Sequence, residues 1–441
     1  MTRSPEWGDA GAALAYLDGL ISYEQSGRLD HPTTERIAGL AAALGNPQRS
    51  YPVIHITGTN GKGSTTAMIA SLLSTQGLRV GTYTSPHLSR IAERITIGGE
   101  PAEDQELAEA ISRVARAAAE TGITPSWFEA LTAAGLWLLA ARGVDVAVVE
   151  VGMLGRWDAT NIVNGTVAVV TNVQLDHTDM AGPSRAAIAA EKAGIIKPGA
   201  TLVLGEQDPD LRPIFEARRP ARILTAGREM SWRNRRPASG GAVVDLVNPW
   251  GARSGIRVGM IGSHQCDNAL LALTAAESFT GQAIPAASVD TALAGTRVPG
   301  RFEIARTDPV VVLDGAHNPA AAAALRQAIE ESFAGIAPRI LLYGALAGRD
   351  PVEFLEQAGV RAMDLVVTTE PRSPRALPAM ALAEAARSFG VPATAVSHPG
   401  RALAAAVTAA GSHGVVIATG SLHLIGPLRA AASTPPPVVK S

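Results

Sequence analysis

Short runs of apolar, β-branched residues alternate along this chain with longer stretches rich in alanine and leucine. The runs are almost continuous in apolar residues, which is typical of parallel strands buried on both faces of a sheet. In the first half of the chain the predicted strands are Val53–Thr57, Val80–Thr84, Val144–Val151, Thr166–Val173 and Thr201–Leu204. Segments with helical composition lie between them, such as Glu106–Glu120 and Phe128–Ala141. This rhythm predicts βαβ units and an α/β fold with a mostly parallel sheet.

The pattern changes twice and divides the chain. Residues 222–261 hold short runs with many Gly, Arg and Pro, which predict a small irregular or antiparallel appendage, and a helix is expected from about Gln265 to Thr280. Pro299 and Gly300 then interrupt any regular element. The α/β rhythm restarts after them, with strands predicted at Val310–Leu313, Ile340–Tyr343, Asp364–Thr369 and Gly414–Ala418. We therefore predict a P-loop domain over 1–297, a smaller Rossmann-like α/β domain over 298–430 and a disordered tail over 431–441.

Composition narrows the functional classes. The chain has 441 residues, a formal net charge of −2 and no basic bias, so nucleic acid is not an expected partner. Cys266 is the only cysteine, which excludes a disulfide framework and predicts a buried thiol. Apolar runs are too short to span a membrane, and the N-terminus lacks the apolar core of a signal peptide. We expect a cytoplasmic protein that acts on small molecules, away from membranes.

The strongest local signal runs from Pro52 to Leu73, where a predicted strand enters a glycine-rich turn and an amphipathic helix follows. Glycines allow backbone N–H groups to form an anion-binding nest, and the helix N-terminus and a lysine add positive charge. The predicted phosphate-binding residues are Gly58, Thr59, Asn60, Gly61, Lys62, Gly63 and Ser64. The loop departs from a strict Walker A sequence, because Gly63 separates the lysine from the serine.

The sequence GTNGKGS resembles the loop of the Mur-type amino-acid ligases, and most closely that of the folylpolyglutamate/dihydrofolate synthases. Further motifs of that family follow in the expected order and spacing. They are LGNPQ (44–48), TSPHL (84–88), ERI (93–95), WFEALTA (127–133), EVGMLGRWDATN (150–161), LDHT (175–178), EKAGIIKPG (191–199), HQCDNA (264–269), PGRFE (299–303), DGAHNPAA (314–321) and GSLH (420–423). The resemblance covers residues 44 to 423.

The resemblance implies ATP with magnesium, two ions being expected, and metal ligands at Ser85, Glu150 and His177. Each of the three also has an ordinary interpretation. Glu150 ends a predicted strand at the edge where α/β ligand sites form, although a salt bridge would place it there too. A lone His177 is commonly structural, and Ser85 could cap a turn. Hard oxygen ligands suit magnesium.

Lys192 is the unexpected member of the predicted catalytic group, which also contains Lys62 and His177. An ammonium cannot bind a cation. In the family, the matching lysine of EKAGI reacts with CO2 to give a carbamate, which supplies negative oxygens beside the magnesium. From spacing alone, Lys192 would be a surface lysine on a helix.

For the second part of the chain, the resemblance implies contacts with the adenine, ribose and phosphates of ATP. The matching residues are Asn268, Arg301, Asp314 and His317. The nucleotide would then lie between two domains, whose closure would align the reactants and exclude water. The alternative for Asp314 is a helix cap.

The resemblance also implies a site for a pterin-bearing substrate. Its residues are Trp127, Phe128, Arg156, Trp157, Asp158 and Ala159. Aromatic faces suit a flat heterocycle, although Trp127 and Phe128 could equally be core residues. Two departures from the family matter here. Leu154 stands where a glycine is usual and bears on the pterin pocket, whereas Gly348 and Arg349 alter the motif DKD and bear on the glutamate site.

The reaction implied is ATP-dependent addition of L-glutamate to dihydropteroate, to folates or to both, through an acyl phosphate, by a monomeric enzyme. We expect both activities. Another Mur-type ligase acting on a different carboxylate is the alternative. A P-loop GTPase or a non-catalytic nucleotide-binding module is a third hypothesis, but the guanine signature NKxD has no match, the nearest segment being Asn172–Asp176.

Overall fold

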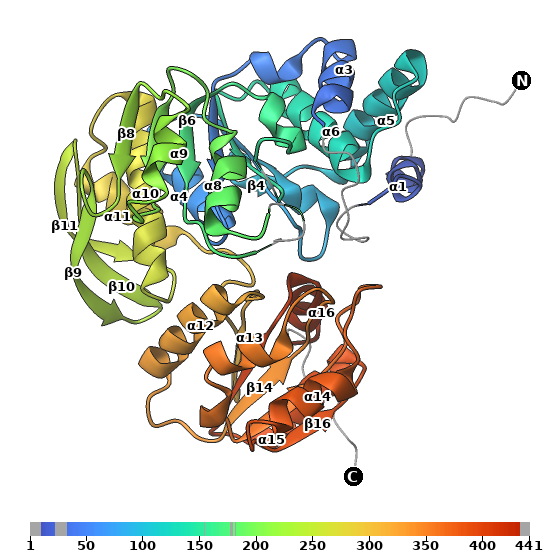
Figure 1. Ribbon diagram of the computed structural model, residues 1–441, viewed down its shortest axis with the longest axis vertical. Helices are drawn as coiled ribbons and strands as arrows, with labels where there is room; N and C mark the ends of the chain where they lie inside the picture. Colours follow the sequence, from blue (N-terminus) through green and yellow to red (C-terminus); the bar gives the residue numbers. More distant parts are fainter. Residues whose placement is uncertain (1–9, 23–32, 154, 177–179, 181, 433–441) are drawn as a thin grey trace, which may run out of the picture. The chain divides into compact units, whose positions relative to one another are not determined.

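The computed structural model describes residues 10–22, 33–153, 155–176, 180 and 182–432. The chain divides into two compact units, and each is described by itself. The first unit comprises residues 1–238, 242–259 and 265–296, and the second comprises residues 239–241, 260–264 and 297–441. In Figure 1 the first unit runs from blue to yellow along the sequence, and residues 297–432 of the second are orange to red.

An eight-stranded sheet organises the first unit, in the order β4-β3-β2-β5-β1-β6-β7-β8. Its strands are β1 (Val53–Thr57), β2 (Val80–Tyr83), β3 (Ile95–Ile97), β4 (Glu100–Pro101), β5 (Val146–Glu150), β6 (Gly165–Val170), β7 (Thr201–Leu204) and β8 (Arg222–Thr225). All neighbours are parallel except β2–β3 and β3–β4, which are antiparallel. The central strand β1 is buried along its whole length, because helices cover both of its faces.

The helices of this unit alternate with the strands in sequence. They are α1 (Ala10–Asp18), α3 (Glu35–Ala43), α4 (Lys62–Ser74), α5 (Asp104–Thr121), α6 (Trp127–Ala141), α8 (Arg185–Ala193), α9 (Arg212–Glu216), α10 (His264–Thr280) and α11 (Ala286–Gly295), with 3-10 turns η1 (Pro47–Arg49), η2 (Ile91–Arg94) and η3 (Ala159–Ile162). Helices α5 and α6 share one apolar cluster with β1, β2 and β5. Helices α8 and α9 pack on β6 and β7, and α4 contacts β1, β2 and β5.

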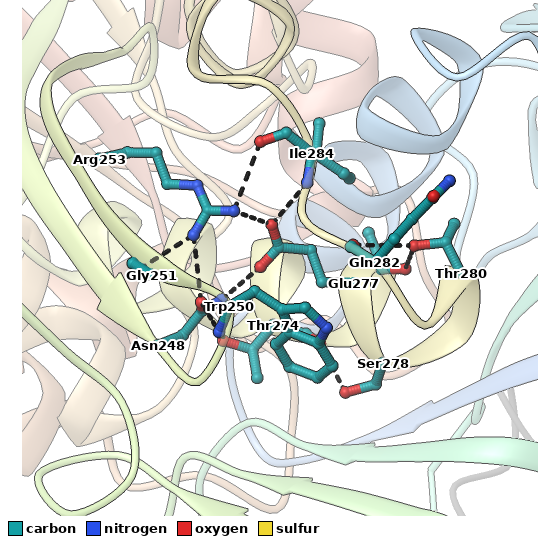
Figure 2. Close-up of polar contacts among 11 residues, drawn as sticks. Asn248, Trp250, Gly251, Arg253, Thr274, Glu277, Ser278, Thr280, Gln282 and Ile284 are labelled. Atoms are coloured by element: carbon teal, nitrogen blue, oxygen red, sulfur yellow. Dashed lines mark hydrogen bonds and ion pairs between the residues drawn. The ribbon is translucent and has the colours of Figure 1, made fainter.

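A separate antiparallel sheet in the order β11-β10-β9 forms the appendage. Its strands are β9 (Ser231–Ala238), β10 (Gly241–Asn248) and β11 (Gly251–Val258). Figure 2 shows the buried polar cluster between this sheet and α10. There Arg253 on β11 pairs with Glu277 on α10, which also accepts hydrogen bonds from Asn248 Nδ2 (2.6 Å) and from the backbone N–H of Ile284 (2.8 Å). Each carboxylate oxygen thus has a donor, which offsets the cost of burying the pair.

The second unit contains a six-stranded sheet in the order β12-β13-β17-β14-β15-β16, parallel except for the β12–β13 pair. Its strands are β12 (Glu303–Thr307), β13 (Val310–Leu313), β14 (Arg339–Tyr343), β15 (Leu365–Thr368), β16 (Ala393–Ala395) and β17 (Val415–Thr419). Its helices are α12 (Pro319–Ser332), α13 (Pro351–Gln357), α14 (Ala379–Arg387), α15 (Pro399–Ala410) and α16 (Leu422–Ala432), with η4 at Val360–Ala362. Helices α12, α13 and α14 share a core with the sheet, and α15 contacts β14, β15 and β17.

The predicted α/β class with mostly parallel sheets is confirmed, and every predicted strand overlaps an observed one. Sequence reasoning missed β3, β4, β12 and β16, which are short and lie at or near sheet edges, where polar residues are tolerated. It also missed β9, and it wrongly placed β8 in the appendage, since β8 pairs with β7 of the main sheet. Cys266 is buried, as expected. Within the described part of the chain, no helix is both long and apolar enough to cross a membrane.

Candidate active site

The predicted phosphate loop joins β1 to α4. The strand ends at Thr57, the turn occupies residues 58–61, and the helix begins at Lys62. Gly61 has a φ of 86°, and a Cβ atom there would lie 2.4 Å from Asn268 Oδ1. Only glycine fits such a position, since both the conformation and the space exclude a side chain. Asn268, predicted to contact the nucleotide, therefore lies directly against this loop.

Residues just after β6 fix the shape of the loop, and sequence reasoning missed them. The backbone N–H of Thr59 donates to the carbonyl of Asn172 (3.0 Å), and that of Asn60 donates to Asn172 Oδ1 (3.0 Å). Thr171 Oγ1 donates to the Asn60 carbonyl (2.6 Å). Gln174 N–H donates to Thr59 Oγ1 (3.0 Å). The one available signal was their position at the carboxyl end of a parallel strand, beside the end of β1.

Two lysines meet at one carbonyl group of the loop. Lys62 Nζ donates to the carbonyl oxygens of Gly58 (3.1 Å) and Thr59 (3.2 Å), and Lys192 Nζ donates to the Gly58 oxygen (2.9 Å). Lys192 comes from the last turn of α8 and is 4% exposed. Burial lowers the pKa of Lys192 to about 7, helped by the nearby charge of Lys62. A neutral amine is therefore far more accessible to Lys192 than to an exposed lysine.

Glu150 and Ser85, two of the predicted metal ligands, lie together beside the loop. The backbone N–H of Ser85 donates to Glu150 Oε2 (3.3 Å). A Cβ atom on Gly63 would lie 3.6 Å from the same carboxylate oxygen, so Glu150 reaches the first turn of α4. The described residues contain no cluster of three His, Cys, Asp or Glu side chains suited to a metal. His177, the third predicted ligand, lies outside the described residues, and its role stays a prediction.

The predicted substrate residues fall into two groups. Trp127 is 7% exposed and lies in the apolar core, with the Arg94 guanidinium 4.7 Å from its ring centre. Phe128 lies beside the second group, which is the segment after β5. A Cβ atom on Gly152 in that segment would approach the Cζ atom of Phe128 to 2.6 Å. The capping box of Ser126 and Glu129 sets the start of α6 and with it both aromatic side chains.

The segment after β5 carries the remaining four predicted substrate residues. Asp158 is buried and accepts hydrogen bonds from the backbone N–H groups of Met153 (3.2 Å) and Thr160 (2.9 Å). Burial raises the pKa of Asp158, and these hydrogen bonds oppose that effect. Ala159 is buried in the core. Leu154, the departure from the family pattern, lies outside the described residues.

Arg156 and Trp157 lie at the surface end of this segment. The Arg156 guanidinium is 4.7 Å from the Trp157 ring centre, and Trp157 is 36% exposed. The backbone N–H of Arg156 donates to the carbonyl of Glu191 (2.8 Å), the residue before Lys192. The predicted substrate segment and Lys192, which is predicted to be catalytic, are therefore joined through α8.

In the second unit, Arg301, Asp314 and His317 lie close together. Asp314 accepts hydrogen bonds from the N–H groups of Phe302 and Ala316 (2.8 Å each). Burial raises the pKa of Asp314, which the charge of Arg301 opposes. The His317 ring lies 2.8 Å from the carbonyl of Gly315. Asp314 thus closes the turn after β13, and the alternative helix cap is provided by Asn318 instead.

The second departure from the family motif can be located as well. Gly348 adopts a φ of 87°, which a glycine allows. Arg349 donates to the carbonyl of His317. The arginine therefore contacts one of the residues predicted to bind the nucleotide.

Comparison with known proteins identifies the family. The model of the Mur ligase middle domain matches residues 56–276, and that of the Mur ligase glutamate ligase domain matches residues 300–422. A dihydrofolate synthase/folylpolyglutamate synthase of Mycobacterium tuberculosis is 39% identical over 393 residues, covering 83% of this chain and 80% of the relative. The Escherichia coli enzyme of the same name is 34% identical over 309 residues, covering 70% of each chain.

Solved structures agree with this assignment. The M. tuberculosis folylpolyglutamate synthase complexed with ADP has a TM-score of 0.89 and 35% identity, covering 97% of this chain and 100% of that one. E. coli FolC in complex with DHPP and ADP has a TM-score of 0.86 and 29% identity, covering 96% and 98%. The chain belongs to the dihydrofolate synthase/folylpolyglutamate synthase family of the Mur ligases and is an ATP-dependent amino-acid ligase.

Proposed function

We propose that this enzyme joins the amine of L-glutamate to a carboxylate of dihydropteroate and of tetrahydrofolate, at the expense of ATP. The observation that carries the proposal is the meeting of Lys62, Lys192 and Glu150 around one loop between β1 and α4. Such a set provides the charges that phosphoryl transfer requires. The acceptors are inferred from the names of the relatives that share the fold.

The reaction needs an activated carboxylate because an amine does not attack a carboxylate readily. The γ-phosphoryl group of ATP passes to the acceptor carboxylate, which gives an acyl phosphate and ADP. The glutamate amine then attacks the acyl carbon, inorganic phosphate leaves, and the amide nitrogen loses a proton. Lys62 and the backbone N–H groups of residues 61–64, at the start of α4, would hold the phosphates during both steps. This sequence requires no nucleophile from the protein.

Magnesium fits the residues present beside the loop. The Glu150 carboxylate and the Ser85 hydroxyl are hard oxygen ligands of the kind that magnesium prefers, and their backbone contact places them together. When bound, magnesium would neutralise negative charge on the phosphate oxygens. In the second unit, Arg301, Asp314 and His317 are proposed to bind the nucleotide. Asn268 of the first unit is proposed to contact it as well.

Lys192 is proposed to work as a carbamate. Carbamate formation needs a neutral amine, and burial lowers the pKa of Lys192 to about 7. The nitrogen lone pair adds to the carbon of CO2, forming an N–C bond, and one proton leaves the nitrogen for solvent. The product carries a negative charge beside Lys62. The carbamate would therefore replace repulsion between two cations with attraction.

The test is a phosphate-release assay with ATP, magnesium and L-glutamate, in which dihydropteroate or tetrahydrofolate is added in turn. Mass spectrometry should find a product heavier by one glutamyl residue with each acceptor. A product with one acceptor alone would refute the double activity. If neither acceptor reacts although ATP binds, the substrate is another carboxylate, as in other Mur-type ligases.

A further inference from the structure

His55 is a buried polar residue at the centre of the main sheet that the proposed reaction does not use. It lies in the middle of β1, where it pairs with Val149 of β5 and Ala168 of β6, and it is 0% exposed. Its Nε2 atom lies 3.0 Å from Thr160 Oγ1. Thr160 belongs to η3, in the segment that holds four predicted substrate residues. A histidine of the central strand thus touches the substrate segment.

The hydrogen bonds determine where the protons lie. Thr160 Oγ1 is 2.6 Å from Asp158 Oδ1, and this carboxylate also accepts from the backbone N–H groups of Thr160, Met153 and Gly152. A carboxylate can only accept hydrogen bonds, so the Thr160 hydroxyl donates its hydrogen bond to Asp158. The Thr160 oxygen must then accept a hydrogen bond from His55. His55 therefore donates a hydrogen bond to Thr160, and Thr160 donates one to Asp158.

The Nδ1 atom of His55 supports donation from His55 to Thr160. His55 Nδ1 has no hydrogen-bond partner among the described residues. Burial, aided by the charge of Lys197, lowers the pKa of His55 to about 3, so the ring is neutral and has one proton. That proton lies on Nε2, because Nδ1 has no acceptor. The ring therefore leaves one nitrogen unsatisfied, and a leucine would pack in the apolar cluster without that cost.

We propose that His55 is a positioning residue for the substrate loop, defined here as Gly152, Met153 and residues 155–161. Through Thr160 it orients the Asp158 carboxylate, which in turn holds the N–H groups at the start of the loop. The same strand leads into the phosphate loop three residues later, at Gly58. β1 therefore sets the position of both loops. The part of this inference that concerns the acceptor rests on the proposed function.

Three variants test the proposal. His55→Leu removes the donor at similar volume, whereas His55→Gln retains an N–H donor near the position of Nε2. Thr160→Val removes the hydroxyl that links His55 to Asp158 and keeps the shape of the side chain. The first readout is hydrogen exchange followed by mass spectrometry on peptides that contain Asp158 and Thr160, without substrates. The second is the pair of KM values for ATP and for the pterin acceptor.

We expect His55→Leu and Thr160→Val to speed exchange in the substrate loop and raise the acceptor KM about tenfold, as loss of one buried hydrogen bond implies. The KM for ATP should stay within about twofold, and the double variant should be no worse than either single one. His55→Gln should resemble the wild type. Wild-type exchange in a folded His55→Leu variant, or equal damage by Gln and Leu, would overturn the proposal.

Two further outcomes remain interpretable. If His55→Leu does not fold, Thr160→Val carries the same comparison, and unchanged exchange in that variant overturns the proposal. If the wild-type enzyme does not glutamylate any pterin, the proposed function fails. The exchange measurement then still decides whether His55 holds the loop, because it uses no substrate.

Discussion

Replacing Lys192 with methionine should make the protein more stable and abolish its activity. The unmodified ammonium is buried in the first unit, next to Lys62 and with the Gly58 carbonyl as its hydrogen-bond acceptor. Methionine has a similar length and no charge to desolvate. Gly58 would keep Lys62 as a donor. The change therefore removes a destabilising charge and leaves the carbonyl hydrogen-bonded.

The size of the effect follows from the pKa of Lys192. Its fall from 10.5 to about 7 corresponds to a cost on the order of 5 kcal/mol for holding the cation in the folded state. Loss of the hydrogen bond to Gly58 lowers the stability gained by the variant by about 1 kcal/mol. Relaxation of the protein around the charge lowers this gain further. We expect a net gain of roughly 1–3 kcal/mol at pH 6 in CO2-free buffer.

The dependence on pH has a definite sign. Below pH 7 the lysine is charged in both states, and the full cost is present. Between pH 7 and 10.5 the unfolded state binds more protons than the folded state, so the wild type gains stability as pH rises. The advantage of Lys192→Met should therefore shrink across this range. Carbamate formation would shrink it further wherever CO2 is supplied.

The assay is urea denaturation of both proteins at pH 6, 7.5 and 9, with and without bicarbonate, alongside phosphate release. Lys197→Met is the matched control. Burial lowers the pKa of Lys197 as well, but its Nζ donates to two oxygens of Asn161 at 2.9 Å, so its replacement should stabilise the protein less than Lys192→Met does. The chain has four lysines, so a carbamate formed from ¹³C-labelled bicarbonate should be assignable by ¹³C NMR with the methionine variant. A methionine variant less stable than the wild type at pH 6, or one with full activity, would refute the reasoning.

Three further predictions concern the loop, the metal ligand and the appendage. Gly61→Ala should raise the KM for ATP at least about tenfold, because its Cβ would meet Asn268, whereas Gly77→Ala, with φ of 80° and open space, should cost only ~1 kcal/mol of stability in a melting experiment. Glu150→Gln should lower kcat about 100-fold or more and weaken the magnesium dependence of phosphate release, while fluorescent ATP analogues still bind. Glu277→Leu should destabilise by about 3–5 kcal/mol in urea titrations, since its buried guanidinium partner loses its charge pair, and a loss below 1 kcal/mol would contradict the assigned burial.

Sequence reasoning succeeded where the information is local. A strand, glycines, a lysine and a helix lie within about twenty residues, so the loop at Gly58–Ser64 could be predicted with its correct flanking elements. Its anchors could not, because Asn172 comes from a distant segment and reads as an ordinary polar residue after a strand. Contacts of this kind depend on which strands are neighbours, and strand order is not written in any single segment. The same holds for Asn268, which only the resemblance singled out.

His55 illustrates a second limit. Periodicity places it on one face of β1 with Val53 and Thr57, but a strand buried on both faces gives no signal that separates a polar position from its apolar neighbours. The burial of Lys192 escaped for a related reason. A lysine near the end of a helix usually lies at the surface, and only packing against the loop shows that this one is buried. The buried positions of His55 and Lys192 can be recognised only once their hydrogen-bond acceptors are known.

Under the proposed function, the location of these two residues would let one sheet position two substrates. β1 bears His55, which points to the substrate loop, and ends at the phosphate loop, whose Gly58 carbonyl receives Lys192. α8 bears Lys192, and its Glu191 carbonyl accepts from Arg156 in the substrate loop. Each loop is therefore fixed by the same strand and the same helix. Rigid elements of this kind would keep the proposed acceptor carboxylate and the γ-phosphate aligned, since a shift of one loop alone would break contacts at both.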